Sequence, residues 1–105
     1  MSAIIRSFPL ARRAGKLRAV AAGFEARQHE RSRGRPYIER AVRDAGGQLH
    51  RAGVPAADVR KEIDAFLLAL ACRLAGRGLV LPPIRVDVAG VGRIEHAPTR
   101  SDGAA

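Results

Sequence analysis

The chain lacks the features that mark a disulfide scaffold, a secreted protein or a membrane protein. Cys72 is its single cysteine, so no disulfide can form within the chain. Its longest apolar stretch, residues 65–72, is far shorter than the roughly 20 residues that span a bilayer. The Arg-rich start is not followed by a clean apolar run, as a secretory signal would be. We therefore expect no transmembrane segment and a cytoplasmic location.

Catalytic and metal-binding patterns are also missing. The three histidines, His29, His50 and His96, are far apart, and none has a second Cys or His at ligand spacing. The acidic residues Asp58 and Asp64 stand beside Arg60 and Lys61, an arrangement typical of surface ion pairs. We expect no metal, no cofactor, no catalytic residue and hence no enzyme.

Positive charge is the strongest feature that is present. Lys and Arg number 19 against 10 acidic residues, for a net charge of +9, and only Lys16 and Lys61 are lysine. Most of the excess lies in residues 1–35. Arginine forms bidentate contacts with phosphates, so this bias points to polyanions such as DNA or RNA. A genome whose base composition favours Ala, Arg and Gly codons would explain the same bias equally well.

The periodicity predicts a mainly α domain of three helices over residues 1–78. Ser7-Phe8-Pro9 is a typical helix start, preceded by a short extended arm. Apolar residues then recur at helical spacing at Leu10, Ala14, Leu17, Ala21 and Phe24. A linker follows, and the chain's second and third helices are expected at about 36–53 and 56–76.

The second and third helices are predicted to form an antiparallel hairpin. Gly53 suits the left-handed end of one helix, and Pro55 can open the next. A kink is possible at Gly46-Gly47. The second half of the third helix is apolar nearly all round, which predicts burial on more than one side and an inert, buried thiol at Cys72.

The tail, residues 79–105, changes character. Residues 84–88 alternate as a half-buried strand does, and residues 93–95 could pair back after a turn at 89–92. A lone hairpin is only marginally stable, so this one would need to pack on the helices. Residues from about 97 onward are expected to be disordered.

Two functions from different classes remain open. The first is an accessory protein that binds nucleic-acid phosphates without reading sequence, through basic residues of the N-terminal helix. These residues are Arg12, Arg13, Lys16 and Arg18, with Arg6 just before the helix. The second is a protein-interaction or self-association module that uses the apolar stripe of the first helix or the apolar end of the third. A helix on an anionic membrane surface is a third option.

Residues 49–63 partly match a DNA-binding helix-turn-helix. Gly53, Val54 and Val59 fit that motif, but Glu62 stands where an apolar residue is usual. The long, partly apolar helix that follows leaves little polar face for DNA. A plain helical hairpin explains the same residues.

The opening residues carry a resemblance. An apolar pair, Ile4-Ile5, precedes Phe8-Pro9-Leu10, one residue, and Arg12-Arg13. This start resembles that of a family of short, basic, uncharacterised bacterial proteins, a domain of unknown function. Gly53-Val54, Glu62-Ile63 and Ala65 stand at places comparable to its helical hairpin, so the resemblance covers roughly residues 4–75. It implies a helical fold and no particular activity.

Overall fold

The computed structural model describes residues 14–30 and 34–97, and these residues form three helices and one β-hairpin. The elements, in chain order, are α1 (Ala14–Ala26), α2 (Arg35–Arg51), α3 (Ala56–Ala75), β1 (Ile84–Val88) and β2 (Gly92–His96). The mainly α class and the predicted number of helices are confirmed. The expected helix start at 7–9, the extended arm before it and the tail from 98 lie outside the described residues.

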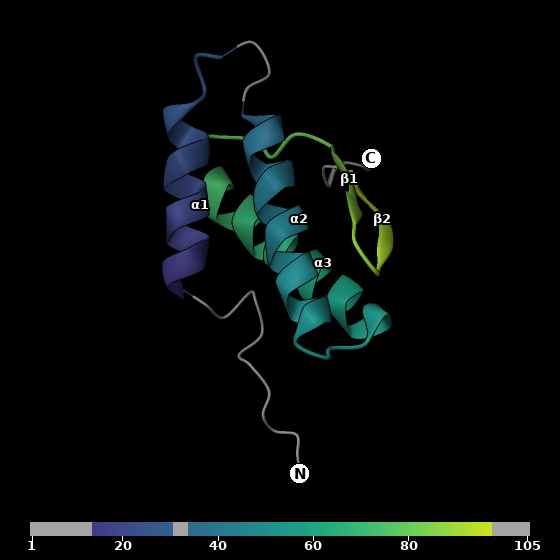
Figure 1. The fold of residues 1–105 in the computed structure, drawn as a ribbon. Coiled ribbons are helices and arrows are strands. Elements are labelled where there is room, and N and C mark those ends of the chain that lie inside the picture. The colour runs from purple at the N-terminus through teal and green to yellow at the C-terminus, as the bar shows by residue number, and fades with distance from the viewer. Residues whose placement is uncertain (1–13, 31–33, 98–105) are drawn as a thin grey trace, which may run out of the picture.

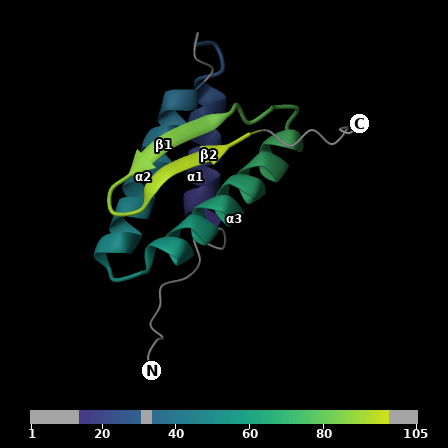
Figure 2. The ribbon, with the colours of Figure 1, turned by 90° about the vertical axis from the view of Figure 1, so that its right-hand side faces the viewer.

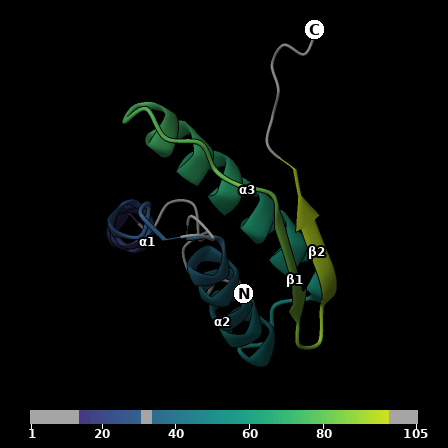
Figure 3. The ribbon, with the colours of Figure 1, turned by 90° about the horizontal axis from the view of Figure 1, so that it is seen from above.

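The helices form two layers with the hairpin along one side. α1 and α2 run antiparallel beside each other, and α3 crosses behind them (Figure 1). The hairpin covers the side formed by α2 and α3, away from α1, with β1 over α2 and β2 toward α3 (Figure 2). Seen from above, α3 lies on one side and the pair α1 and α2 on the other (Figure 3). The outward faces of α2 and α3 therefore point in different directions.

The predicted hairpin of α2 and α3 is confirmed, with boundaries close to those expected. Just beyond the end of α2, Gly53 has φ 100°, and the amide of Val54 donates to the carbonyl of Leu49 at 3.1 Å. α3 ends the same way, with Gly78 at φ 76° and a 2.9 Å bond from the amide of Leu79 to the carbonyl of Leu74. A left-handed residue followed by an apolar one is a common helix end, because it pairs carbonyls that the helix leaves free. Glycine adopts that conformation at little cost.

α2 is not interrupted at Gly46-Gly47, where the sequence made a kink possible. α2 runs unbroken through both glycines, and both are buried. Tertiary packing stabilises a helix more than propensity does, and here it outweighs the weakness of two adjacent glycines.

One hydrophobic core joins all five elements. α1 contributes Val20, Ala21 and Phe24, so the stripe predicted from Leu17 to Phe24 packs inward, with Leu17 half-buried. The remaining buried hydrophobic residues are Ile38, Val42, Ala45, Leu49, Val59, Ile63, Phe66, Leu67, Leu70, Leu74, Leu81, Ile84, Val86, Val88 and Ile94. The hairpin is thus part of the same core as the helices.

The predicted burial of the second half of α3 on more than one side was wrong. Leu68 is 54% exposed, and Cys72 is exposed rather than an inert buried thiol. The apolar run from 65 to 72 is wider than the face that α1, α2 and the hairpin cover. The residues beyond that face, mostly alanine, meet solvent.

The tail forms the predicted hairpin. β1 and β2 pair antiparallel, with Val86 opposite Ile94 and Arg85 opposite Glu95. Alternate residues of β1 are buried against the helices, as the alternating sequence predicts. None of the helices in residues 14–30 and 34–97 has the length and hydropathy needed to cross a membrane.

Candidate nucleic-acid interface

The structure separates the two described members of the predicted basic site. Arg6, Arg12 and Arg13 lie outside the described residues, whereas Lys16 and Arg18 are on α1. Residues two apart on a helix project about 200° apart, so these two side chains leave α1 on different flanks. They therefore do not form a single basic face of α1.

Lys16 lies on the flank of α1 that faces α2. It is two turns before Gly23, whose backbone rests against the side chain of Tyr37 in α2. Arg18 stands two turns before Glu25, which pairs with Arg77 beyond the end of α3, with 3.0 Å between Arg77 Nε and Glu25 Oε1. Lys16 therefore borders the α2 side of the molecule, and Arg18 borders the opposite flank of α1.

Arg27, just beyond the end of α1, packs against the start of α2. Its guanidinium lies 4.2 Å from the centre of the Tyr37 ring, and its Nη1 donates to the carbonyl of Gly23 at 3.0 Å. These contacts join the end of α1 to the start of α2. They also cover one face of the tyrosine ring, which is therefore less available for stacking on a base.

Four other arginines form ion pairs with carboxylates. Arg77 pairs with Glu25, and Arg35 reaches Glu39 at 3.9 Å. The remaining two belong to the hairpin: Arg85 reaches Glu95 at 3.7 Å, and Arg93 reaches both Asp87 at 3.5 Å and Glu95 at 3.7 Å. These pairs are exposed and contribute little stability. They do neutralise the surfaces on which they stand.

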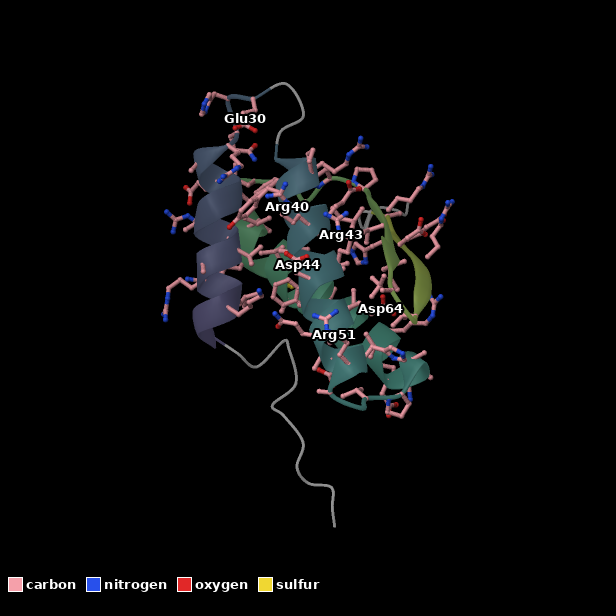
Figure 4. The ribbon with its side chains drawn as sticks, viewed as in Figure 1. Glu30, Arg40, Arg43, Asp44, Arg51 and Asp64 are labelled. Carbon is pink, nitrogen blue, oxygen red and sulfur yellow. The ribbon has the colours of Figure 1, made fainter. Side chains whose placement is uncertain are left out.

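The outward face of α2 carries arginines of a different kind. Arg40, Arg43 and Arg51 are exposed, and none forms an ion pair with another described residue. Figure 4 shows all three on the same side of α2, with Asp44 among them. We call Arg40, Arg43 and Arg51 the α2 basic face. Two of its charges remain even if Asp44 offsets one.

Gly47 shapes this face. A Cβ on Gly47 would lie 3.3 Å from Nη1 of Arg51, so the Arg51 side chain lies back over the preceding turn of α2. Long helical side chains point in this direction, toward the N-terminus. The guanidinium of Arg51 is thereby brought closer to Arg40 and Arg43 than its position in the sequence implies.

The α2 basic face is not among the residues predicted from the sequence. Charges nearly balance over residues 36–75, with six basic and five acidic side chains, so that segment gives no signal as a whole. A helical projection of α2 alone does give one. It sets Arg40, Arg43 and Arg51 opposite the buried residues Ile38, Val42 and Leu49.

In the described part of the chain, the side chains are not arranged as other kinds of site would require. No three His, Cys, Asp or Glu side chains there lie close enough to hold a metal ion. A shallow hollow of about 360 Å³ opens between the start of α2 and the hairpin. It is lined by Arg35, Glu39, Arg85 and Glu95, which pair with one another.

Comparison with known protein families identifies the family of this sequence. A model of a family of unknown function, DUF6074, matches residues 1–80. The chain belongs to this family. The match confirms the resemblance seen in the opening residues and covers α1, α2 and α3 but neither strand of the hairpin. No curated protein and no solved structure matches the chain significantly.

Proposed function

We propose that this member of DUF6074 is a non-enzymatic accessory protein that binds the phosphates of duplex nucleic acid without reading sequence. One observation carries the proposal: the α2 basic face presents three exposed arginines from one helix, and none forms an ion pair with another described residue. Arginine contacts to phosphates supply most of the affinity of non-specific binding. A cytoplasmic location follows from the proposal as an expectation.

Lys16 extends the α2 basic face toward α1. It lies on the flank of α1 that faces α2, so it is the described basic residue of α1 that can add to this surface. Arg6, Arg12 and Arg13 precede it in the chain and remain part of the proposal. Arg18 projects from the other flank and has no place in this surface.

The aromatic residues favour a duplex over a single strand. Proteins that bind single strands stack bases on aromatic rings. In the described chain, Phe24 and Phe66 are buried, and Tyr37 is half-buried with one ring face under Arg27. A surface that offers guanidinium groups and few free rings suits the regular phosphates of a duplex.

α3 is a weaker candidate for the nucleic-acid contact. Its outward face mixes Asp58 and Asp64 with Lys61 and includes the exposed Leu68. A recognition helix in a major groove would bring those carboxylates toward phosphates. The alternative of a protein-interaction module also has less support on α1, because the stripe of α1 is part of the chain's own core.

The test compares two triple variants that remove the same charge from different surfaces. Arg40→Ala/Arg43→Ala/Arg51→Ala removes the α2 basic face, and Arg77→Ala/Arg85→Ala/Arg93→Ala removes three arginines already paired with carboxylates. Binding to labelled duplex and to a single strand of the same length is measured by fluorescence anisotropy across a salt series. Circular dichroism confirms that both variants fold.

We expect the first variant to flatten the dependence of log K on log salt, by roughly 0.9 for each phosphate that the variant no longer neutralises. The second variant should keep nearly the wild-type slope, and wild type should prefer the duplex. Equal effects of the two variants would mean that net charge, and not the α2 basic face, drives binding. Absence of binding at low salt would show that the proposal is wrong. A third variant, Arg12→Ala/Arg13→Ala/Lys16→Ala, measures the N-terminal contribution.

A further inference from the structure

The two edges of the hairpin are not equivalent. On the outer edge of β1, the backbone amide of Arg85 donates to Oε2 of Glu39 in α2 at 2.9 Å. β1 also packs over α2, so α2 covers that edge. β2 forms the other edge, and α3 meets the hairpin at its turn, where Arg60 donates to the carbonyl of Val91 at 3.3 Å.

The Arg85 bond fixes which backbone groups of β2 point outward. Because the Arg85 amide points away from β2, the pair Arg85 and Glu95 is a non-hydrogen-bonded pair of the ladder. The pair Asp87 and Arg93, two residues along, has the same character. The N–H and C=O groups of Arg93 and Glu95 therefore face outward from β2. No described group bonds to them.

We propose that this edge of β2 pairs, antiparallel, with β2 of a second copy of the chain, about a two-fold axis at Ile94. In that register Arg93 stands opposite Glu95 of the second copy, and Glu95 stands opposite its Arg93. Both outward residues of one edge thus meet both outward residues of the other. Four hydrogen bonds form, and Ile94 faces its own counterpart in the non-hydrogen-bonded position between them.

The side chains fit the same register. Arg93 and Glu95 share the exposed face of β2, and Ile94 lies on the buried face. Pairing about Ile94 places a guanidinium opposite a carboxylate on each side of the axis, which favours cross-strand contact. In-register parallel pairing would instead set like charges beside each other. The strand is therefore complementary to itself in one orientation.

Pairing also removes a weakness of the fold. A two-stranded sheet is marginal by itself, and an exposed edge is a template for adding strands. A sheet of four strands across two copies would satisfy the open edge of each. The α2 basic face does not take part, so this proposal and the proposed nucleic-acid binding can fail separately.

The experiment is sedimentation velocity on the full chain from about 10 µM to about 1 mM, with two charge variants. Glu95→Arg gives a strand with two basic residues, and Arg93→Glu gives one with two acidic residues. We expect wild type to form dimers as concentration rises, and each variant alone to dimerise at least ~10-fold more weakly. An equimolar mixture of the two variants should form dimers again, because the basic strand meets the acidic one. Circular dichroism checks that each variant retains the native fold.

Four outcomes would overturn the proposal. Wild type that stays monomeric throughout the range excludes a dimer of this kind. Variants that dimerise as well as wild type, or a mixture that gains nothing, place the contact elsewhere. Leu68→Lys tests the exposed face of α3: if this variant abolishes dimers while Glu95→Arg preserves them, α3 and not β2 is the interface.

Discussion

Gly46 of α2 and Val88 of β1 approach so closely that no side chain fits between them. A Cβ on Gly46 would lie 2.8 Å from Cγ1 of Val88 and 3.0 Å from Cδ1 of Ile63 in α3. Three elements therefore meet at a position without a side chain. The close packing of the hairpin on the helices depends on this glycine.

Gly46→Ala should lower the free energy of unfolding. Overpacking a core typically lowers stability by about 1–3 kcal/mol. The better helix propensity of alanine offsets up to ~1 kcal/mol of that loss. Urea unfolding followed by circular dichroism measures the difference. The matched control is Gly47→Ala, whose Cβ would meet only the flexible end of Arg51 at 3.3 Å. We expect that variant to be neutral or slightly stabilised. Equal losses in the two variants would contradict the packing argument.

Glu39→Ala should loosen the start of β1. The Glu39 carboxylate accepts a hydrogen bond from the backbone amide of Arg85, which points away from β2. Losing an exposed hydrogen bond of this kind costs about 1 kcal/mol. Hydrogen exchange of the Arg85 amide should quicken in Glu39→Ala. Glu39→Gln keeps an oxygen acceptor and should exchange more nearly as wild type does. Unchanged exchange in Glu39→Ala would show that the bond is not formed in solution.

Leu67 and Leu68 are neighbours in sequence with opposite expected effects. Leu67 is fully buried and Leu68 is 54% exposed. Leu67→Ala should cost about 2–5 kcal/mol of stability, since it leaves a cavity in the core. Leu68→Ala should change stability by about 0.5 kcal/mol or less. Thermal and urea unfolding of the two variants, side by side, measure this contrast. A large loss in Leu68→Ala would mean that a second chain covers this residue.

The pattern of residues was enough to predict the helices and the hairpin. Apolar spacing located α3 within one residue of its observed end, and Gly53 and Pro55 located the turn before it. These signals depend only on residues close together in the sequence, so they can be interpreted without knowledge of the tertiary structure. The alternation in 84–88 likewise predicted β1, although only packing on α2 makes so short a hairpin stable.

The same sequence pattern could not predict the features that depend on tertiary structure. The sequence cannot show which part of the apolar run 65–72 the other elements cover, and the burial predicted for Cys72 failed for that reason. It also cannot show which arginines find carboxylates. Arg85 and Arg93 pair within the hairpin, whereas Arg40 and Arg43 pair with no described residue, and local charge does not distinguish them.

The exposure of Cys72 gives the most direct check on the outward face of α3. A thiol exposed in the native state should react fully with a disulfide reagent such as 5,5′-dithiobis(2-nitrobenzoate) without unfolding of the chain. The rate should be first order in reagent and insensitive to low urea, because no opening step precedes the attack. Cys72→Ser should abolish the reaction and change stability by about 0.5 kcal/mol or less.

A rate that instead saturates with reagent and rises with urea would mean that the thiol becomes accessible only on opening. The thiol would then be covered in solution, either by the core or by a second chain, and a concentration series separates the two. Slower reaction at higher protein concentration indicates a second chain, whereas no change indicates the core.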